Sequence, residues 1–84
     1  MKKEVRKDFN ELKRKYPEAV LLVRIGDFYN AYQEDAQKVG EAIKTSATVD
    51  TEGDRHVFFH EHELDTILPK LIRAGNRVAI YDYK

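Results

Sequence analysis

The hydrophobic pattern of the chain centres on one apolar run, residues 20–23. This uninterrupted run, which Ile25 extends past a single charge, is typical of a strand that is buried on both faces. A Gly-Asp turn signal follows at Gly26, and the aromatic-rich residues 28–32 predict a second strand paired with the first. We therefore expect a tight hairpin at the centre of a sheet, with a turn that can require positive φ at Gly26.

The alternation of side chains sorts the second strand into two faces. Successive side chains of a strand point to opposite sides, so Phe28, Asn30 and Tyr32 share one face while Tyr29 and Ala31 share the other. A large ring and a polar amide are therefore expected side by side, roughly 7 Å apart along the strand. Most phenylalanines lie in the core, so the pattern alone leaves the exposure of Phe28 open.

Three amphipathic segments predict helices, at residues 2–15, 33–44 and 63–74. Pro17 ends the first helix, and Pro69 inside the third predicts a kink or a late start because proline donates no backbone hydrogen bond. The apolar stripes of the three helices are Val5, Phe9, Leu12 and Tyr16; Ala36, Val39, Gly40 and Ile43; and Leu64, Ile67, Leu68, Leu71 and Ile72. In the second helix, Glu34 and Asp35 complement the positive end of the helix dipole.

Three further strands complete the predicted order α, β, β, α, β, β, α, β. Residues 46–49 and 55–59 flank a loop-like stretch and form a second hairpin, and residues 77–83 form the last strand. The expected fold class is α+β with an α/β-like character, a small mixed sheet of about five strands with two to three helices packed on it. We expect one module over residues 1–84, with a basic N-terminal helix in 1–16 and the mixed sheet in 17–84.

Length and composition exclude several classes of protein. With 84 residues, 42% of them hydrophobic, one small core is expected. The absence of cysteine excludes disulfides and thiolate metal sites, which suits a reducing cytoplasm. The sequence has no apolar run of membrane-spanning length, and Met1 leads into a charged helix in place of a signal peptide. We expect a cytoplasmic protein without a membrane partner.

The charges balance overall but are unevenly distributed. Fifteen basic residues match fifteen acidic ones, so no global field draws the chain to nucleic acid. Residues 1–16, however, hold seven basic side chains against three acidic ones. A solvated helix face is the ordinary explanation of such charges, and a phosphate-contacting surface is the alternative. The candidate phosphate contacts are Lys2, Lys3, Arg6 and Lys7.

Catalytic chemistry has no support in the sequence. There is no glycine-rich phosphate loop, and the single serine, Ser46, lacks the context of a nucleophile, so neither an enzyme nor a cofactor is expected. If the strand at 55–59 ran on through residue 62, His56, His60 and His62 would share a face that could hold a metal. Solvated imidazoles are the commoner explanation, and the spacing differs from that of zinc motifs, so no metal site is expected.

Two blocks of the sequence resemble the N-terminal mismatch-recognition domain of MutS-type DNA mismatch-repair proteins. The first, VLLVRIGDFYNAYQEDA, is similar to the segment with a Gly-Asp-Phe-Tyr-Glu motif followed by Glu-Asp-Ala. The second, HELDTILPKLIRAGNRVAI, is similar to the stretch from the family's histidine to its final strand. Both blocks occur in the family's order, and the resemblance covers nearly all of residues 16–80.

The resemblance implies a partner and two site residues. In that family the phenylalanine of the motif inserts beside a mispaired base in double-stranded DNA, and the glutamate two residues later bonds to the base. Phe28 matches the phenylalanine, which favours an exposed Phe28 with Tyr29 in the core, and Asn30 replaces the glutamate. The chain also departs from the family at His60-Glu61, where Pro-Tyr or Pro-Phe is usual, and in the last strand, where Glu-Gln is usual. Nothing in these residues matches the family's clamp, lever or ATPase segments.

Two functional hypotheses follow. The first is a stand-alone, non-catalytic DNA-binding module in which Phe28 stacks on a base of mispaired or distorted duplex. The alternative is a protein-interaction domain that kept the fold and lost DNA binding, with a protein partner or a second copy of the chain. The neutral net charge favours the alternative. The basic N-terminal helix together with Phe28 favours the first hypothesis.

Overall fold

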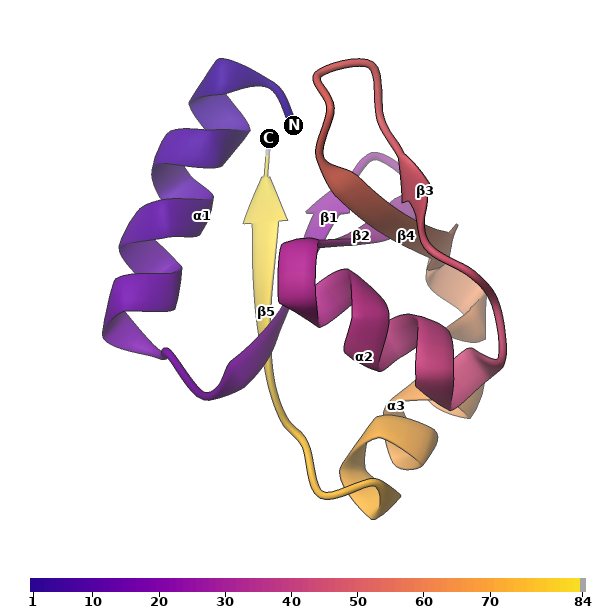
Figure 1. Cartoon of the computed structure of the whole chain (residues 1–84). Coiled ribbons are helices and arrows are strands. Elements are labelled where there is room, and N and C mark those ends of the chain that lie inside the picture. The colour runs from indigo at the N-terminus through magenta and orange to yellow at the C-terminus, as the bar shows by residue number, and fades with distance from the viewer. Residues whose placement is uncertain (84) are drawn as a thin grey trace.

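Strand β1 (Ala19–Ile25) lies between an antiparallel and a parallel neighbour in the computed structural model, which describes residues 1–83 (Figure 1). The antiparallel neighbour is β2 (Phe28–Tyr32), and the parallel one is β5 (Arg77–Tyr83). On its other side β2 pairs antiparallel with β4 (Arg55–His60), which pairs in turn with the short β3 (Thr48–Val49). The result is a mixed five-stranded sheet in the order β3-β4-β2-β1-β5, which confirms the predicted fold class.

Helices cover both faces of the sheet. Helix α1 (Lys3–Lys15) packs on one face, and α2 (Gln33–Ile43) and α3 (Leu64–Arg73) pack on the other, with a 3₁₀ turn, η1 (Glu61–Glu63), before α3 (Figure 1). The apolar run 20–23 is buried throughout, as predicted, because alternate side chains enter the two cores. Within residues 1–83, every helix is too short or too polar to span a bilayer.

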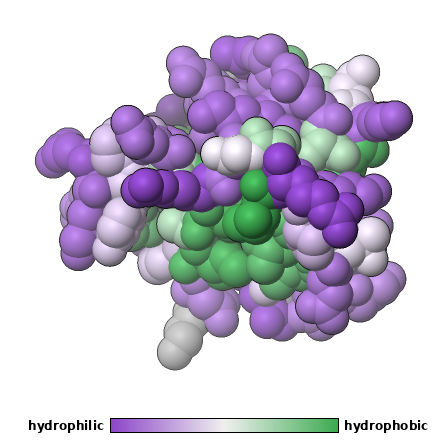
Figure 2. Space-filling view, turned by 90° about the horizontal axis from the view of Figure 1, so that it is seen from below, coloured by the Kyte–Doolittle hydropathy of each residue, from purple (hydrophilic) through white to green (hydrophobic). Residues whose placement is uncertain are grey.

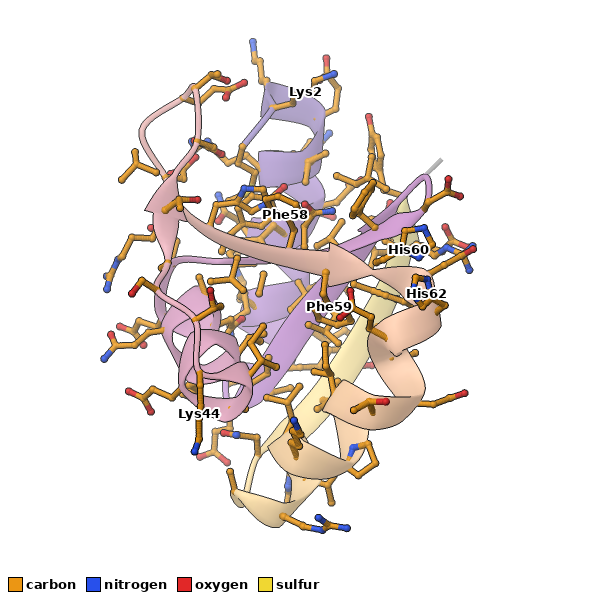
Figure 3. The ribbon with its side chains drawn as sticks, turned by 90° about the vertical axis from the view of Figure 1, so that its right-hand side faces the viewer. Lys2, Lys44, Phe58, Phe59, His60 and His62 are labelled. Atoms are coloured by element: carbon orange, nitrogen blue, oxygen red, sulfur yellow. The ribbon has the colours of Figure 1, made fainter. Side chains whose placement is uncertain are left out.

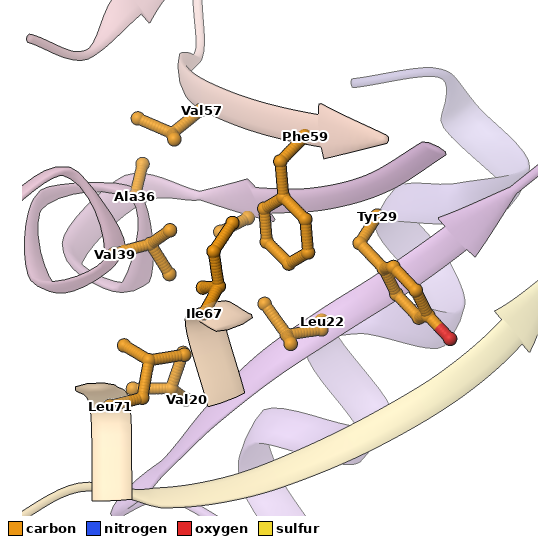
Figure 4. Close-up of a cluster of buried hydrophobic side chains, with 10 residues drawn as sticks. Val20, Leu22, Tyr29, Ala36, Val39, Val57, Phe59, Ile67 and Leu71 are labelled. Carbon is orange, nitrogen blue, oxygen red and sulfur yellow. The ribbon is translucent and has the colours of Figure 1, made fainter. Parts of the chain in front are cut away.

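The two cores differ in composition. The larger one, between the sheet and helices α2 and α3, is mostly aliphatic (Figure 4) and comprises Val20, Leu22, Tyr29, Ala31, Ala36, Val39, Val57, Phe59, Ile67 and Leu71. The smaller one lies beneath α1 and comprises Met1, Val5, Phe9, Leu21, Val23 and Tyr32. In the smaller core, Phe9 meets Tyr32 edge to face with ring centroids 5.9 Å apart.

Three local predictions differ from the structure. The strand predicted at 46–49 is only Thr48–Val49, because the amide of Thr45 donates to the carbonyl of Gly40 and the chain is still turning away from α2. Tyr16 was expected on the buried stripe of α1 but is 47% exposed, since Pro17 ends the helix and Tyr16 is its C-terminal cap. Helix α3 begins at Leu64 and continues through Pro69, so the late start that Pro69 predicted as one alternative does not occur.

Asp35 has a structural role that the sequence pattern did not predict. The pairing of β1 with β2 runs from Ile25 to Val23 and goes no further, although β2 continues to Tyr32. The next inward amide, that of Leu21, donates instead to the carboxylate of Asp35 at 3.1 Å. Lys13 of α1 lies 3.0 Å from the same carboxylate, which is buried with 2% exposure. Asp35 thus links β1 to both α1 and α2.

We predict that Asp35→Ala lowers the free energy of unfolding by about 3 kcal/mol. The variant leaves the buried amide of Leu21 without an acceptor and Lys13 without its counter-charge. Urea unfolding of Asp35→Ala beside Glu34→Ala, which alters the exposed neighbour, measures the difference. Equal and small losses in the two variants would contradict the role given to Asp35.

Gly26 provides a second test of the hairpin. Its φ is 62°, as the turn prediction allowed, and no atom lies within 4 Å of the position a Cβ would take. The cost of a side chain is therefore backbone strain alone, and Gly26→Val should lose about 1 kcal/mol or more. Gly26→Asn should lose less, because asparagine tolerates this conformation. Thermal melting of both variants measures these losses. An unchanged melting temperature for Gly26→Val would show that Gly26 is not needed for the turn.

Candidate nucleic-acid interface

Helix α1 leaves half of its sheet face open. Its apolar side chains pack on β1 and β5 and reach β2 only at Tyr32. Beyond Tyr32, the same face carries Phe28 and Asn30 from β2 and His56, Phe58 and His60 from β4, which we call the aromatic face (Figure 3). The two phenylalanines on it are exposed, Phe28 to 42% and Phe58 to 53%.

Phe28 is exposed and supported by two other rings. It meets Phe58 edge to face at 5.7 Å between centroids, and it meets His60 in the same way at 5.4 Å. Its neighbour Tyr29 points to the opposite face, where it is 7% exposed and stacks on Phe59. The structure thus confirms the predicted division of β2, with Tyr29 in the core and Phe28 at the surface.

Asn30 shares the face of Phe28, as predicted, but it is only 7% exposed. Its amide nitrogen donates to the carbonyl of Val23 at 3.2 Å and to that of Phe28 at 3.3 Å. Its amide oxygen lies 2.7 Å from Nε2 of His56. Because an amide oxygen only accepts, His56 carries a proton on Nε2 in this orientation, and burial lowers the pKa of His56, which favours the neutral ring. Asn30 therefore ties β1, β2 and β4 together beneath Phe28.

The three histidines do not meet at one point. Strand β4 ends at His60, so the continuation through residue 62 that a metal site requires does not occur. His56 stacks on Tyr32 at 4.9 Å, whereas His60 caps η1 by accepting the amide hydrogen of His62. Within residues 1–83, no group of three or more histidines and carboxylates is arranged to hold a metal.

The four basic candidates on α1 fall into two classes. Arg6 donates at 2.6 Å to Asp54 in the β3–β4 loop. The hydrogen bond from the Met1 ammonium, with others from Gln33 and the charge of Arg6, holds the pKa of Asp54 below its ordinary value. The other three, Lys2, Lys3 and Lys7, are exposed and form no ion pair within the described residues. The charge of Arg6 is thus used inside the protein, while those of the lysines face solvent.

Lys2 lies near the aromatic face. It lines a hollow of about 330 Å³ together with Ile25 and Tyr32, and Ile25 is the cross-strand partner of Phe28. Burial, followed by the charges of Asp50 and Asp54, raises the pKa of Tyr32 to about 12, so this wall of the hollow is neutral. The carboxylates of Glu4, Asp50 and Glu52 also line the hollow, so the aromatic face offers rings for stacking beside a margin of mixed charge.

Some features of this site could not be found in the sequence. The bond between Asn30 and His56 joins residues 26 positions apart, and it depends on the β2–β4 register. The ion pair between Arg6 and Asp54 spans 48 positions. The exposure of Phe58 had a weak signal, since strand alternation places it opposite the buried Val57 and Phe59.

Comparison with known proteins identifies the family of the chain. The family model described as MutS domain I matches residues 3–84. The chain is 48% identical, over 90% of its length, to the DNA mismatch repair protein MutS of Flavobacterium johnsoniae. It is equally similar to the proteins of the same name from Phocaeicola vulgatus and Bacteroides thetaiotaomicron. The chain spans about 9% of the length of each of these relatives. A match over nearly all residues, with close identity to curated members, shows that the chain belongs to the MutS domain I family.

Proposed function

We propose that this chain is a non-catalytic module that binds mispaired or distorted double-stranded DNA on its own. Phe28 is the base-stacking wedge, Asn30 stands where a glutamate is usual, and Lys2, Lys3 and Lys7 contact phosphates. Arg6 contacts a phosphate only if it gives up its hydrogen bond with Asp54. The observation that carries the proposal is the exposed Phe28 on the sheet face shared with α1, in a chain whose relatives are named DNA mismatch repair proteins. The cytoplasm remains the expected location.

The surroundings of Phe28 suit a wedge. Inserting a ring into a duplex unstacks a base step at a cost of a few kcal/mol, and the cost is least where pairing is already defective. A ring that is held in one orientation before binding loses little conformational freedom on insertion. Phe58 and His60 hold Phe28 in this way while leaving much of its surface free.

Asn30 acts differently from a glutamate in this setting. Its amide has donors and an acceptor and no charge, so it repels no phosphate. His56 lies at the partly buried margin of the aromatic face. Asn30 must give up its hydrogen bond with His56 before its amide oxygen can bond to a base edge. A carboxylate at the same place only accepts hydrogen bonds, so it lowers the affinity for a well-paired duplex.

One observation favours a second candidate function. Ile72 of α3 and Ile80 of β5 are 54% and 49% exposed. Figure 2 shows hydrophobic surface on the side of the molecule that carries α3 at the bottom of Figure 1. Such a patch, with a net charge of zero, suits a protein partner or a second copy of the chain. If the chain binds no DNA, this interaction role replaces the first proposal.

Replacing Lys2, Lys3 and Lys7 by alanine should weaken duplex binding and flatten its salt dependence together. Each phosphate contact contributes about 0.9 to the slope of log affinity against log salt, so the slope should fall by up to about 3 units. Fluorescence anisotropy with a labelled duplex over a series of salt concentrations measures both quantities. The matched control replaces three exposed lysines, Lys38 of α2, Lys44 at the C-terminal cap of α2 and Lys70 of α3, and should leave the slope nearly unchanged. Equal effects of the two triple variants would exclude α1 as the phosphate-binding surface.

The wedge and its neighbour are tested by two single variants. Phe28→Ala should reduce binding to paired and mispaired duplexes and erase any preference between them. Asn30→Glu should weaken binding to the perfect duplex more than to the mispaired one, because a displaced base offers the carboxylate a donor and a paired base does not. Competition binding gives both ratios, with melting temperatures to check folding. An equal loss on both duplexes for Asn30→Glu would show that residue 30 does not face a base.

A further inference from the structure

Phe58 is more exposed than Phe28, yet in the proposed wedge it only supports Phe28. It projects from β4 beside Phe28, and its ring is flanked by Phe28 on one side and by His56 on the other, at 5.7 and 5.2 Å between centroids. These contacts hold the ring in place and leave 53% of the residue exposed. The neighbouring rings thus hold Phe58 in place while its own ring stays open to solvent. Another aromatic ring can stack on it.

The relative orientation of the two rings decides what can stack on them. The planes of Phe28 and Phe58 are 79° apart. Two bases lying on these rings would be splayed nearly at right angles, which the parallel stacking inside a duplex forbids and an unpaired strand allows. Each base has a π-face, so such a platform accepts a single strand with little sequence preference.

The charges around the aromatic face favour one side for the phosphates. Toward the β1–β2 turn, carboxylates border the face: Glu61 pairs with Arg24, Glu63 accepts from the amide of His60, and Asp27 is exposed. On the α1 side, Lys2 is exposed, and Figure 3 shows it on the same side of β4 as Phe58, with Phe59 on the other side. Lys2 shares its hollow with Glu4, Asp50 and Glu52, so the N-terminal end of α1 is mixed in charge, whereas the turn has an excess of carboxylates. A backbone of phosphates is therefore repelled more strongly by the turn than by the α1 side.

We propose that Phe28 and Phe58 together form a platform for two unstacked bases of a single DNA strand whose phosphates run along the α1 side. This inference rests on the proposed function and extends it from the duplex to the unpaired strand. The ring of Phe58 distinguishes the two substrates, because a wedge in a duplex inserts only Phe28 and needs from residue 58 no more than an apolar support. A protein occupant is less well matched, since the aliphatic surface around Ile72 and Ile80 lies away from the lysines of α1.

The test is anisotropy of a short labelled oligothymidylate, which cannot pair with itself, beside a labelled duplex with one mispair, at low salt. Phe58→Leu keeps an apolar contact with Phe28 but offers no ring, so it should weaken oligothymidylate binding about tenfold, the loss expected for one stacked base, and should change duplex binding less than twofold. Phe58→Ala also removes the support of Phe28, so it should weaken the binding of both substrates. Ile80→Ala, an exposed apolar truncation on the other face, is the control and should change neither affinity.

The outcomes separate this inference from the proposed function. Unchanged oligothymidylate binding by Phe58→Leu, or an equal loss on both substrates, would overturn it, because the ring of Phe58 would then be idle or would only position Phe28. Duplex binding without any oligothymidylate binding would also overturn it and leave the proposed function standing. Failure of the wild type to bind either DNA would overturn both.

Discussion

One helix is too narrow to cover the sheet on which it packs. A helix with its side chains is about 10 Å across and strands lie about 4.8 Å apart, so a single helix covers about two strands. Two helices, α2 and α3, cover one face of the five-stranded sheet, whereas α1 alone lies on the other. The side chains of β2 and β4 on the α1 side are therefore left at the surface. The exposure of Phe28 and Phe58 follows from this mismatch in width.

The same architecture explains how the open half stays ordered. Strand β1 is buried on both faces and anchors β2, and Asp35 secures β1 where its pairing with β2 ends. Asn30 then joins β2 to its two neighbours through Val23 and His56. Phe28 is thus held on a strand whose backbone is fixed from both sides, which is the rigidity that insertion into a base stack needs.

The sequence predicted what depends on local periodicity. The order of the elements, the buried run 20–23 and the core position of Tyr29 all follow from side-chain alternation and helical spacing. The burial of Asn30 could not be predicted, because it depends on His56, which another hairpin brings into register. For the same reason Arg6 was grouped with the free lysines, although the fold pairs it with Asp54. Non-local pairing is what a single sequence leaves undetermined.

The surface chemistry differs between the two sides of the molecule. The net charge of zero conceals a division, with an excess of carboxylates at the β1–β2 turn and, at the start of α1, exposed lysines beside the carboxylates of Glu4, Asp50 and Glu52. The aliphatic surface of α3 and β5 is separate from this division, so a DNA role and a protein-binding role would use different sides. Mapping the contact surface therefore distinguishes them.

The most direct test is backbone-amide NMR of the labelled chain during titration with a mispaired duplex at low salt. The account predicts that the largest shifts cluster at Phe28, Phe58 and the first turn of α1, with little change in α3. Shifts that gather around Ile72 and Ile80, or none at saturating DNA, would contradict the claim that the open aromatic face binds DNA.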